Sequence, residues 1–428
     1  MAAMSNADSR LAGRLNEGVS RMRWPVVGLL SFGMIIAYFD RVNLSVALPA
    51  MSGEFGWNET QQGLAMSVIF WTYTALQIPG GILVDRYGVR LLYFAGFLIW
   101  SIASASTALT GTLAVLCAFR LLVGVGESVV TPASMRYIRL HFDERQRGLA
   151  VGLYMTGTKV GPAVGLPVCA YLVSALGWRA MFLLVGLASL VWLLPWLAWV
   201  RKDDIAAVAR PKTPGRPGAD QVSAGQIMRS PMMWGVIIGT YCYMYFVYYC
   251  MTWMPTYFKK VHGMSITEMG WYGGFAFGGM AAVAALAGWG ADVMIRRGRD
   301  AVAVRKGFTI AGFLLAATQT LGVFTDSTTL MLFFAVFSLC GLGLATANYW
   351  ALTQTLIPGG SIAMVVGIQN TAANLAGISS PWITGWLIDT TGSFDSPIKL
   401  IGFWLVLGVA CYLVLVRRRY APARRTDA

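Results

Sequence analysis

Charged residues are scarce in this sequence. They make up 12% of the 428 residues, whereas an ordinary soluble domain has about 25%. Apolar types account for 57%, and a soluble fold lacks the polar surface needed to keep so apolar a chain in water. The composition therefore excludes a soluble fold and predicts a membrane protein.

Residues that commonly hold metals or act as bases are also few. The only two histidines, His141 and His262, lie near predicted loops. The six cysteines all fall inside apolar runs without metal-ligand spacing, which is typical of small packing residues. We therefore expect no metal site, no cofactor and no histidine-based catalysis.

Long apolar runs, by contrast, are abundant. A helix needs about 20 apolar residues to cross the hydrocarbon core of a membrane. Twelve runs meet this requirement, so we predict an all-α membrane protein with twelve transmembrane helices. The runs are Pro25–Ala47, Leu64–Val84, Leu91–Leu109, Leu113–Ile138, Leu149–Leu176, Met181–Val200, Met232–Tyr257, Gly270–Ala291, Gly307–Phe324, Leu330–Leu356, Met364–Ile388 and Leu400–Val416.

The runs fall into two groups of six. Residues 24–200 hold the first group and residues 231–417 the second, and residues 201–230 between them are rich in Pro, Gly, Lys and Arg, as in a solvated linker. Residues 1–23 and 418–428 are predicted to be cytoplasmic tails, the first of them disordered. No short apolar segment with a cleavage site precedes the first run, so we expect no removable signal peptide.

The basic residues are distributed unevenly among the predicted loops. Of 33 Lys and Arg residues, 26 lie in the tails and the even-numbered loops, whereas the odd-numbered loops hold only Arg179, Lys259, Lys260 and Lys399. By the positive-inside rule this pattern predicts a multi-pass protein of the cell inner membrane with both termini cytoplasmic. The net charge of +14 therefore reflects topology and contact with lipid, not nucleic-acid binding.

A short motif occurs twice. Gly81, Asp85 and Arg90 follow the second run, and the same residue types follow the eighth run 207 positions later, at Gly288, Asp292 and Arg297. This repeat predicts two similar six-helix halves in parallel order, with a substrate site between them.

Five charged residues lie deep inside predicted helices, all in the first half: Asp40, Arg41, Arg120, Glu127 and Lys159. Each such charge costs about 2.5–3.5 kcal/mol at the membrane centre on insertion scales. They must therefore be paired or line a water-filled cavity.

Their spacing suggests which of them cooperate. Arg120 and Glu127 are seven residues apart and share a helix face, whereas the adjacent Asp40 and Arg41 point to different partners. Lys159 has no evident acidic partner. Three cations and two acids leave a net charge of +1, which suits an anionic substrate. Protons are the simplest agents to neutralise the two acids during transport. The alternative is that these residues form inert ion pairs with a structural role only.

The second half supplies uncharged polar groups. Asn370 and Asn374 are four residues apart on one helix face, and Trp350 lies in the tenth run. We expect them to contact substrate, although membrane asparagines also bond neighbouring helices. The glycines at 157, 161 and 165 form a small-residue ridge that favours close helix packing.

These motifs resemble the major facilitator superfamily over nearly the whole chain. Residues 81–90, Gly-Ile-Leu-Val-Asp-Arg-Tyr-Gly-Val-Arg, are similar to its signature loop between the second and third helices. Three further stretches resemble the anion:cation symporter family, and bacterial galactonate-type transporters in particular. They are Tyr-Phe-Asp-Arg-Val-Asn at 38–43, Tyr-Thr-Ala-Leu-Gln-Ile-Pro-Gly-Gly at 73–81 and Arg-Leu-Leu-Val-Gly-Val-Gly-Glu at 120–127.

The resemblance implies a role for each site residue. Arg41 would hold the substrate carboxylate with Tyr73 nearby, Asp40 and Glu127 would carry protons, and Arg120 would balance Asp40 within the substrate site. Lys159 is not part of the family pattern, and we expect from its depth, and from the positions of Trp350, Asn370 and Asn374, that these four residues complete that site. The signature residues would control the conformational change: Gly81, Asp85, Arg86, Gly88, Arg90 and Asp292.

The function predicted from these features is proton-coupled uptake of a small organic anion, such as a sugar acid, by a monomer. A proton-coupled drug antiporter remains an alternative, because Gly157–Gly165 also resembles the fifth-helix motif of that group. A membrane sensor of the same fold is a further one. A membrane enzyme lacks a suitable nucleophile and base here, and a channel would need a repeated ring of filter residues.

Overall fold

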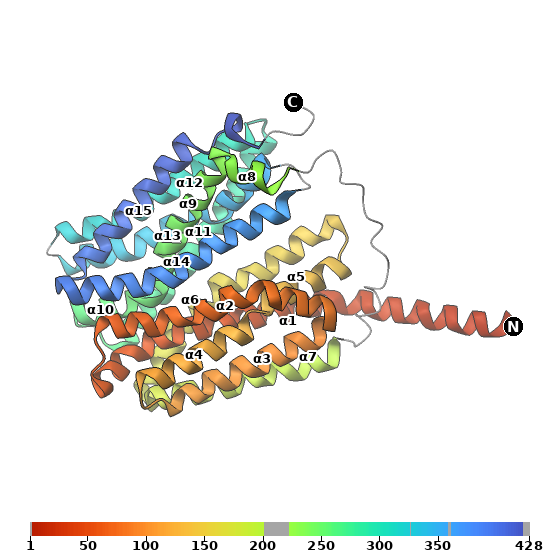
Figure 1. Ribbon diagram of the computed structural model, residues 1–428, viewed down its shortest axis with the longest axis horizontal. Helices are drawn as coiled ribbons and strands as arrows, with labels where there is room; N and C mark the ends of the chain where they lie inside the picture. Colours follow the sequence, from red (N-terminus) through yellow and green to blue (C-terminus); the bar gives the residue numbers. More distant parts are fainter. Residues whose placement is uncertain (1, 201–221, 326, 358–360, 423–428) are drawn as a thin grey trace.

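The computed structural model describes residues 2–200, 222–325, 327–357 and 361–422. These residues contain no strand, and the long helices form one bundle (Figure 1). The α-helices are α1 (Ala2–Phe55), α2 (Glu59–Tyr87), α3 (Val89–Ser106), α4 (Leu113–Glu127), α5 (Val130–His141), α6 (Glu144–Ser189), α7 (Leu193–Trp199), α8 (Ala224–Arg229), α9 (Pro231–Thr252), α10 (Met254–His262), α11 (Ile266–Arg296), α12 (Ala301–Ala317), α13 (Thr328–Leu356), α14 (Ile362–Thr391) and α15 (Asp395–Val414).

The chain crosses the bundle twelve times, which confirms the predicted fold class. Nine stretches of the described residues are long and apolar enough to span a membrane. One of them, Gln146–Trp199, turns at Gly177, whose φ of 84° breaks the helix, and so makes two crossings. The consecutive helices α9 and α10 form another crossing and α14 the last. Both hold polar residues, tyrosines in α9 and asparagines in α14, and neither is among the nine stretches.

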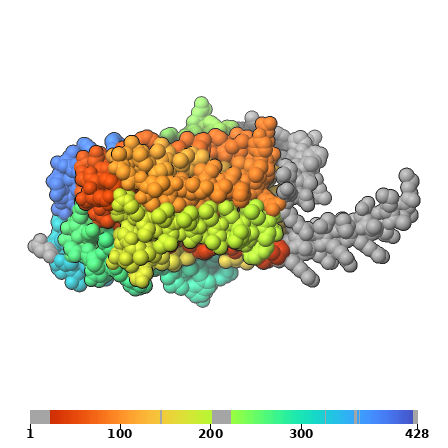
Figure 2. Space-filling model, turned by 90° about the horizontal axis from the view of Figure 1, so that it is seen from below, coloured from red at the N-terminus to blue at the C-terminus, as the bar shows by residue number. Residues whose placement is uncertain are grey.

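The two groups of six crossings lie on either side of the bundle. In Figure 1 the amino-terminal half, α1–α7, lies below the carboxyl-terminal half, α8–α15. Figure 2 shows the outer face of the amino-terminal half, where orange and yellow-green residues lie side by side. Large apolar side chains such as Trp71, Tyr171 and Leu194 are exposed on the protein surface, as expected for a surface that faces lipid.

The predicted tails and linker differ from the structure in two places. Helix α1 begins at Ala2, so the segment predicted to be a disordered tail is helical, continuous with the first crossing. Residues 201–221 of the predicted linker and residues 423–428 lie outside the described residues, and the end of the linker contains the short helix α8. Ser223 caps α8 through a reciprocal bond with Gln226, a local signal that Pro and Gly content alone does not reveal.

The two ends of the bundle are named here by the chain termini. The tail side is the end where both termini lie in Figure 1, and the far side is the opposite end. On the far side, helices of the two halves meet along two lines of contact. We call them the α2–α14 seam and the α6–α11 seam.

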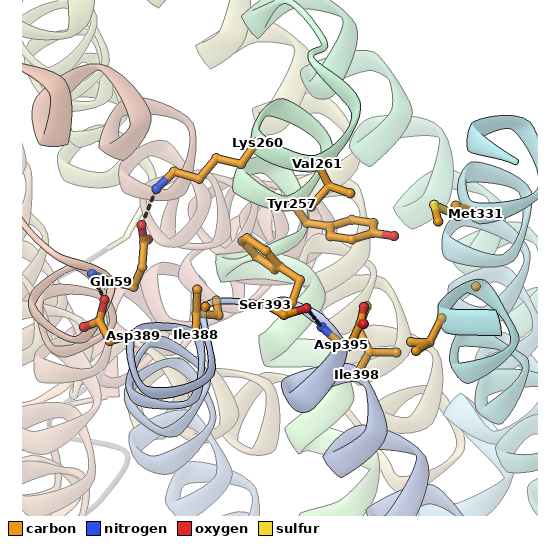
Figure 3. A pocket seen from close by; sticks show the side chains of 14 residues that line it. Glu59, Tyr257, Lys260, Val261, Met331, Ile388, Asp389, Ser393, Asp395 and Ile398 are labelled. Atoms are coloured by element: carbon orange, nitrogen blue, oxygen red, sulfur yellow. Dashed lines mark hydrogen bonds and ion pairs between the residues drawn. The ribbon is translucent and has the colours of Figure 1, made fainter. Parts of the chain in front are cut away.

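The α2–α14 seam is closed by polar contacts. Asp389 of α14 accepts hydrogen bonds from the backbone N–H groups of Glu59 and Thr60, at 3.0 and 2.6 Å, and so caps the first turn of α2 from the other half of the protein. Glu59 also forms an ion pair with Lys260 of α10 (Figure 3). We call Glu59, Thr60, Lys260 and Asp389 the far-side latch.

The α6–α11 seam is closed by small residues instead. A side chain at Gly270 would collide with Ala170, and one at Gly274 with the backbone oxygen of Ala163. Leu166 lies against Gly273 in the same row. Because the glycines at 270, 273 and 274 have no side chain, the backbone of α11 can approach α6 closely at this seam.

Because Asp389 caps α2 across the two halves, we predict that Asp389→Asn weakens far-side closure. The loss of a charged helix cap costs about 1 kcal/mol, which corresponds to a severalfold shift between closed and open forms. Ser67 is 1% exposed on the α2–α14 seam, so a cysteine there reports opening. Maleimide should label Ser67→Cys severalfold faster in the Asp389→Asn background.

Asp395→Asn is the matched control, because Asp395 lies beside the latch, on α15, and its backbone bonds within its own half. If Ser67→Cys is labelled equally fast in the Asp389→Asn and Asp395→Asn backgrounds, the cap does not hold the seam closed.

Candidate functional site

Arg41 and Glu127 form an ion pair inside the amino-terminal half. Nε and Nη2 of Arg41 both donate to Oε2 of Glu127, at 3.0 and 2.8 Å. The side chains are 7% and 1% exposed. Among the described residues, Oε1 of Glu127 has no hydrogen-bond partner. One carboxylate oxygen thus occupies the inner edge of the guanidinium, and the other is free to carry a proton.

Aromatic rings surround the guanidinium of Arg41. Its carbon lies 4.6 Å from the ring centroid of Tyr38, 4.8 Å from that of Tyr73 and 5.6 Å from that of Phe70. Phe70 in turn packs edge-on against Tyr248 of α9, with ring centroids 4.6 Å apart. The rings fix the plane of the guanidinium and bring the carboxyl-terminal half close to it.

Glu127 reaches this position because glycines precede it. A side chain at Gly124 would collide with the backbone oxygen of Ile69, and one at Gly126 with that of Gly96. These glycines allow α4 to pack closely against α2 and α3, and α4 ends at Glu127 itself. The carboxylate therefore lies at a break in the fourth crossing.

Asp40 has a separate set of partners, as its adjacency to Arg41 predicted. Its carboxylate accepts from Asn43 Nδ2 at 2.8 Å, Trp100 Nε1 at 3.0 Å and Ser104 Oγ at 2.6 Å. Asp40 is fully buried. Neutral donors thus stabilise the carboxylate without neutralising its charge.

Arg120 contacts the backbone of Asp40 and reaches its carboxylate only through Asn43. Its guanidinium donates to the backbone oxygen of Asp40 at 3.2 Å and to Asn43 Oδ1 at 3.1 Å, not to the Asp40 carboxylate. Asn43 bonds both residues and so separates the charges by one side chain. Arg120 acts on Asp40 through Asn43, and it is 2% exposed.

Asn370 and Asn374 point toward the same acceptor, as their spacing predicted. Both side-chain amides donate to Gln77 Oε1 of α2, at 2.7 and 3.3 Å. Gln77 also donates to the hydroxyl of Tyr73 at 3.4 Å. A chain of polar contacts therefore links α14 through Gln77 and Tyr73 to the ring that covers Arg41.

Lys159 and Trp350 lie apart from this network. Trp350 packs beside Tyr349, with ring centroids 5.3 Å apart. Lys159 is partly exposed in the middle of the fifth crossing. No hydrogen bond or ion pair joins either side chain to Arg41, Glu127 or Asp40 within the part of the chain that the structure describes. Their predicted contact with substrate stays a prediction.

The signature residues lie at the tail side. Asp85 pairs with Arg136 of α5, and Arg90 donates to the backbone oxygen of Leu197 at 2.8 Å. Gly88 joins α2 to α3 with a φ of 88°, a conformation that favours glycine. Arg86 is exposed, and Gly81 faces Pro132 across ordinary van der Waals contact.

Asp292 of the repeated motif also pairs within its own half, although its partner lies on the third crossing of that half and the partner of Asp85 on the fourth. Asp292 of α11 accepts from Arg305 of α12 at 3.2 Å. Each acid thus pairs within its own half while the two halves are held together on the far side. A role in conformational change stays a prediction for this whole group.

A pocket of about 550 Å³ lies beside the far-side latch (Figure 3). Tyr257, Ser393 and Asp395 line it together with Lys260 and Asp389. None of the predicted substrate residues is among its lining residues. The pocket therefore belongs to the far-side surface and not to the site around Arg41.

Several residues of the site were not assigned a role from sequence, among them Tyr38, Asn43, Gln77, Trp100 and Ser104. Trp100 and Ser104 are four residues apart on an apolar helix, a spacing that signals a shared polar partner. Tyr38 and Gln77 lie in the motifs at 38–43 and 73–81, in which the sequence assigned roles to other residues only. Only the packing of α2 against α14 reveals that Gln77 joins the two halves.

Comparisons with known proteins agree with this architecture. The family description "Major Facilitator Superfamily" matches residues 30–301. The chain is 29% identical over 409 residues to "Uncharacterized transporter YybO" of Bacillus subtilis (strain 168), which covers 92% of this chain and 94% of that one. It is 28% identical over 418 residues to "Probable L-galactonate transporter" of Escherichia coli (strain K12), with 95% and 92% covered.

A further relative is "Probable galactarate/D-glucarate transporter GudP" of Bacillus subtilis (strain 168), 26% identical over 425 residues with 92% of each chain covered. Among solved structures, a bacterial homologue of the human lysosomal transporter Spinster, in an inward-facing and occupied conformation, superimposes with a TM-score of 0.79. It is 19% identical and covers 94% of this chain and 98% of its own, which supports the fold alone.

The chain belongs to the Major Facilitator Superfamily, because the family description matches more than half of it. It is therefore a multi-pass membrane transporter and not an enzyme. Relatives named as galactonate and galactarate transporters agree with the predicted resemblance to anion:cation symporters.

Proposed function

We propose that this protein takes up a small organic anion, such as a sugar acid, together with protons by alternating access. The ion pair between Arg41 and Glu127 is the observation that carries the proposal. Among the described arginines, only Arg41 is both packed against aromatic rings and buried in the membrane interior, where it pairs with Glu127. The names of the anion and sugar-acid transporters among the relatives support an anionic substrate.

The pair couples substrate to proton by competition. A substrate carboxylate and Glu127 share the charge of one guanidinium, and two carboxylates sharing one cation at membrane depth repel each other. A proton on Glu127 removes its charge and frees Arg41 for the substrate. Oε1 of Glu127, which has no partner among the described residues, is the atom that accepts this proton.

The remaining assignments follow from the topology. The excess of Lys and Arg in the tails and even-numbered loops supports the cytoplasmic position of both termini in the inner membrane. The tail side is then cytoplasmic, and the far-side latch closes the protein toward the outside. We assign residues 24–200 and 231–417 as the two moving halves of a lipid-embedded monomer.

We predict that Glu127→Gln abolishes accumulation driven by a proton gradient but spares exchange. Glutamine resembles the protonated acid and cannot ionise, so Arg41 stays available while coupling is lost. The measurement is uptake and counterflow of radiolabelled L-galactonate or galactarate in proteoliposomes with an imposed pH gradient. Proton-driven accumulation at the wild-type level in this variant would remove Glu127 from the coupling step.

Counterflow also tests the alternatives. A membrane sensor would bind the acid without exchanging it across the bilayer. A drug antiporter would export its substrate as protons enter and would not accumulate the acid.

We predict that Arg41→Lys weakens binding of the acid by about tenfold, although the charge is retained. An ammonium cannot reproduce the two parallel bonds of a guanidinium, and one charge-assisted bond is worth about 1.5–3 kcal/mol. Titration calorimetry on the purified protein measures the change. Lys399→Arg, at an exposed lysine, is the control and should leave the affinity unchanged. Unchanged affinity in Arg41→Lys would instead show that Arg41 has only a structural role.

A further inference from the structure

Lys159 is a cation without a partner in the middle of the membrane. It lies at the centre of the fifth crossing, and neither an acid nor a backbone oxygen among the described residues bonds its amine. An unpaired charge at this depth is costly, so a group that arrives during transport is the natural partner for it.

The helical register of α6 shows which way Lys159 faces. Residues 159, 163, 166 and 170 lie on one stripe, and Ala163, Leu166 and Ala170 contact α11 of the other half. The glycine ridge at 157, 161 and 165 instead packs against α1, as predicted. Lys159 therefore faces the carboxyl-terminal half, on the face of α6 that carries Ala163, Leu166 and Ala170.

The α6–α11 seam opens at the level of Lys159. Toward the far side, Leu166 and Ala170 on its stripe are buried. Toward the tail side, Gly152, Met155 and Thr156 on the same stripe are exposed. Lys159 thus stands between the closed and the open part of the seam, where a substrate held at Arg41 would extend.

The neighbours of α6 on α1 give the depth of Lys159 in the bundle relative to Arg41. A side chain at Gly157 would meet Ser31, and one at Gly161 would meet Ile35 and Tyr38. Lys159 is therefore level with Ile35, six residues before Arg41, which corresponds to about 9 Å along the helix axis.

We propose that Lys159 binds a second carboxylate of the substrate and so makes the transporter selective for diacids over monoacids. The inference rests on the proposed function, because it takes Arg41 as the anchor of the first carboxylate. With Glu127 protonated, Arg41 and Lys159 present two positive charges to two negative ones. A monoacid leaves Lys159 unpaired in the seam.

The test compares two acids of equal carbon number on the purified full-length protein. Titration calorimetry measures the affinities of galactarate, a diacid, and of L-galactonate, a monoacid. The wild type should bind galactarate more tightly. Lys159→Met should weaken galactarate binding by about tenfold or more and change L-galactonate binding less than about threefold.

Two controls separate charge from packing. Lys159→Arg keeps the charge and should retain the preference for galactarate. Lys399→Met makes the same chemical change at an exposed lysine and should leave both affinities unchanged. The pH profile of L-galactonate uptake should also stay unchanged in Lys159→Met, whereas a lysine that pairs with Glu127 would shift it.

The outcomes distinguish this inference from the proposed function. Equal losses for the two acids, or an unchanged preference in Lys159→Met, would overturn the role of Lys159 and leave anion transport intact. A wild-type protein that binds neither acid, and no other carboxylate of a thermal-shift screen, would overturn the proposed function together with the inference.

Discussion

The structure depends on the cost of placing charge inside a membrane. Arg41, Glu127, Asp40 and Arg120 are almost fully buried, and each is stabilised in a different way. Arg41 and Glu127 neutralise each other, whereas neutral donors on α1 and α3 hold Asp40. A site that has to release and rebind a substrate cannot satisfy every charge permanently. The pair of Arg41 and Glu127 is the one whose balance a proton or an anion can change.

The two halves divide the work unequally. The amino-terminal half holds the buried charges, and the carboxyl-terminal half meets them with uncharged groups, such as Asn370 and Asn374 on Gln77. Neutral hydrogen bonds exchange partners at a net cost of about 1 kcal/mol, which is far less than separating a buried ion pair. At the centre of the membrane the carboxyl-terminal half bonds through neutral groups, and its charged contacts through Asp389 and Lys260 lie near the far-side surface, so it is free to move against the charged half.

Most of the fold and part of the site could be predicted from the sequence. Hydropathy is a local property, so the twelve crossings and the depth of Asp40 and Glu127 follow from it directly. Pairing is not local: the sequence does not reveal that Glu127 bonds Arg41, or that Asn43 lies between Arg120 and Asp40. Asp389 resembles an ordinary helix-end residue until the packing of α14 on α2 shows what it caps.

The two far-side seams show how closure remains reversible. The far-side latch lies near the surface, so its carboxylates and amides regain hydrogen bonds to water when the seam opens, and little net free energy is lost. On the α6–α11 seam the contacts are those of glycine and alanine, and their separation exposes no unsatisfied side chain. Neither seam contains a buried ion pair that would have to be broken without compensation. The halves are thus held together strongly enough to close one side, and weakly enough for the proton and the anion of the proposed mechanism to decide which side opens.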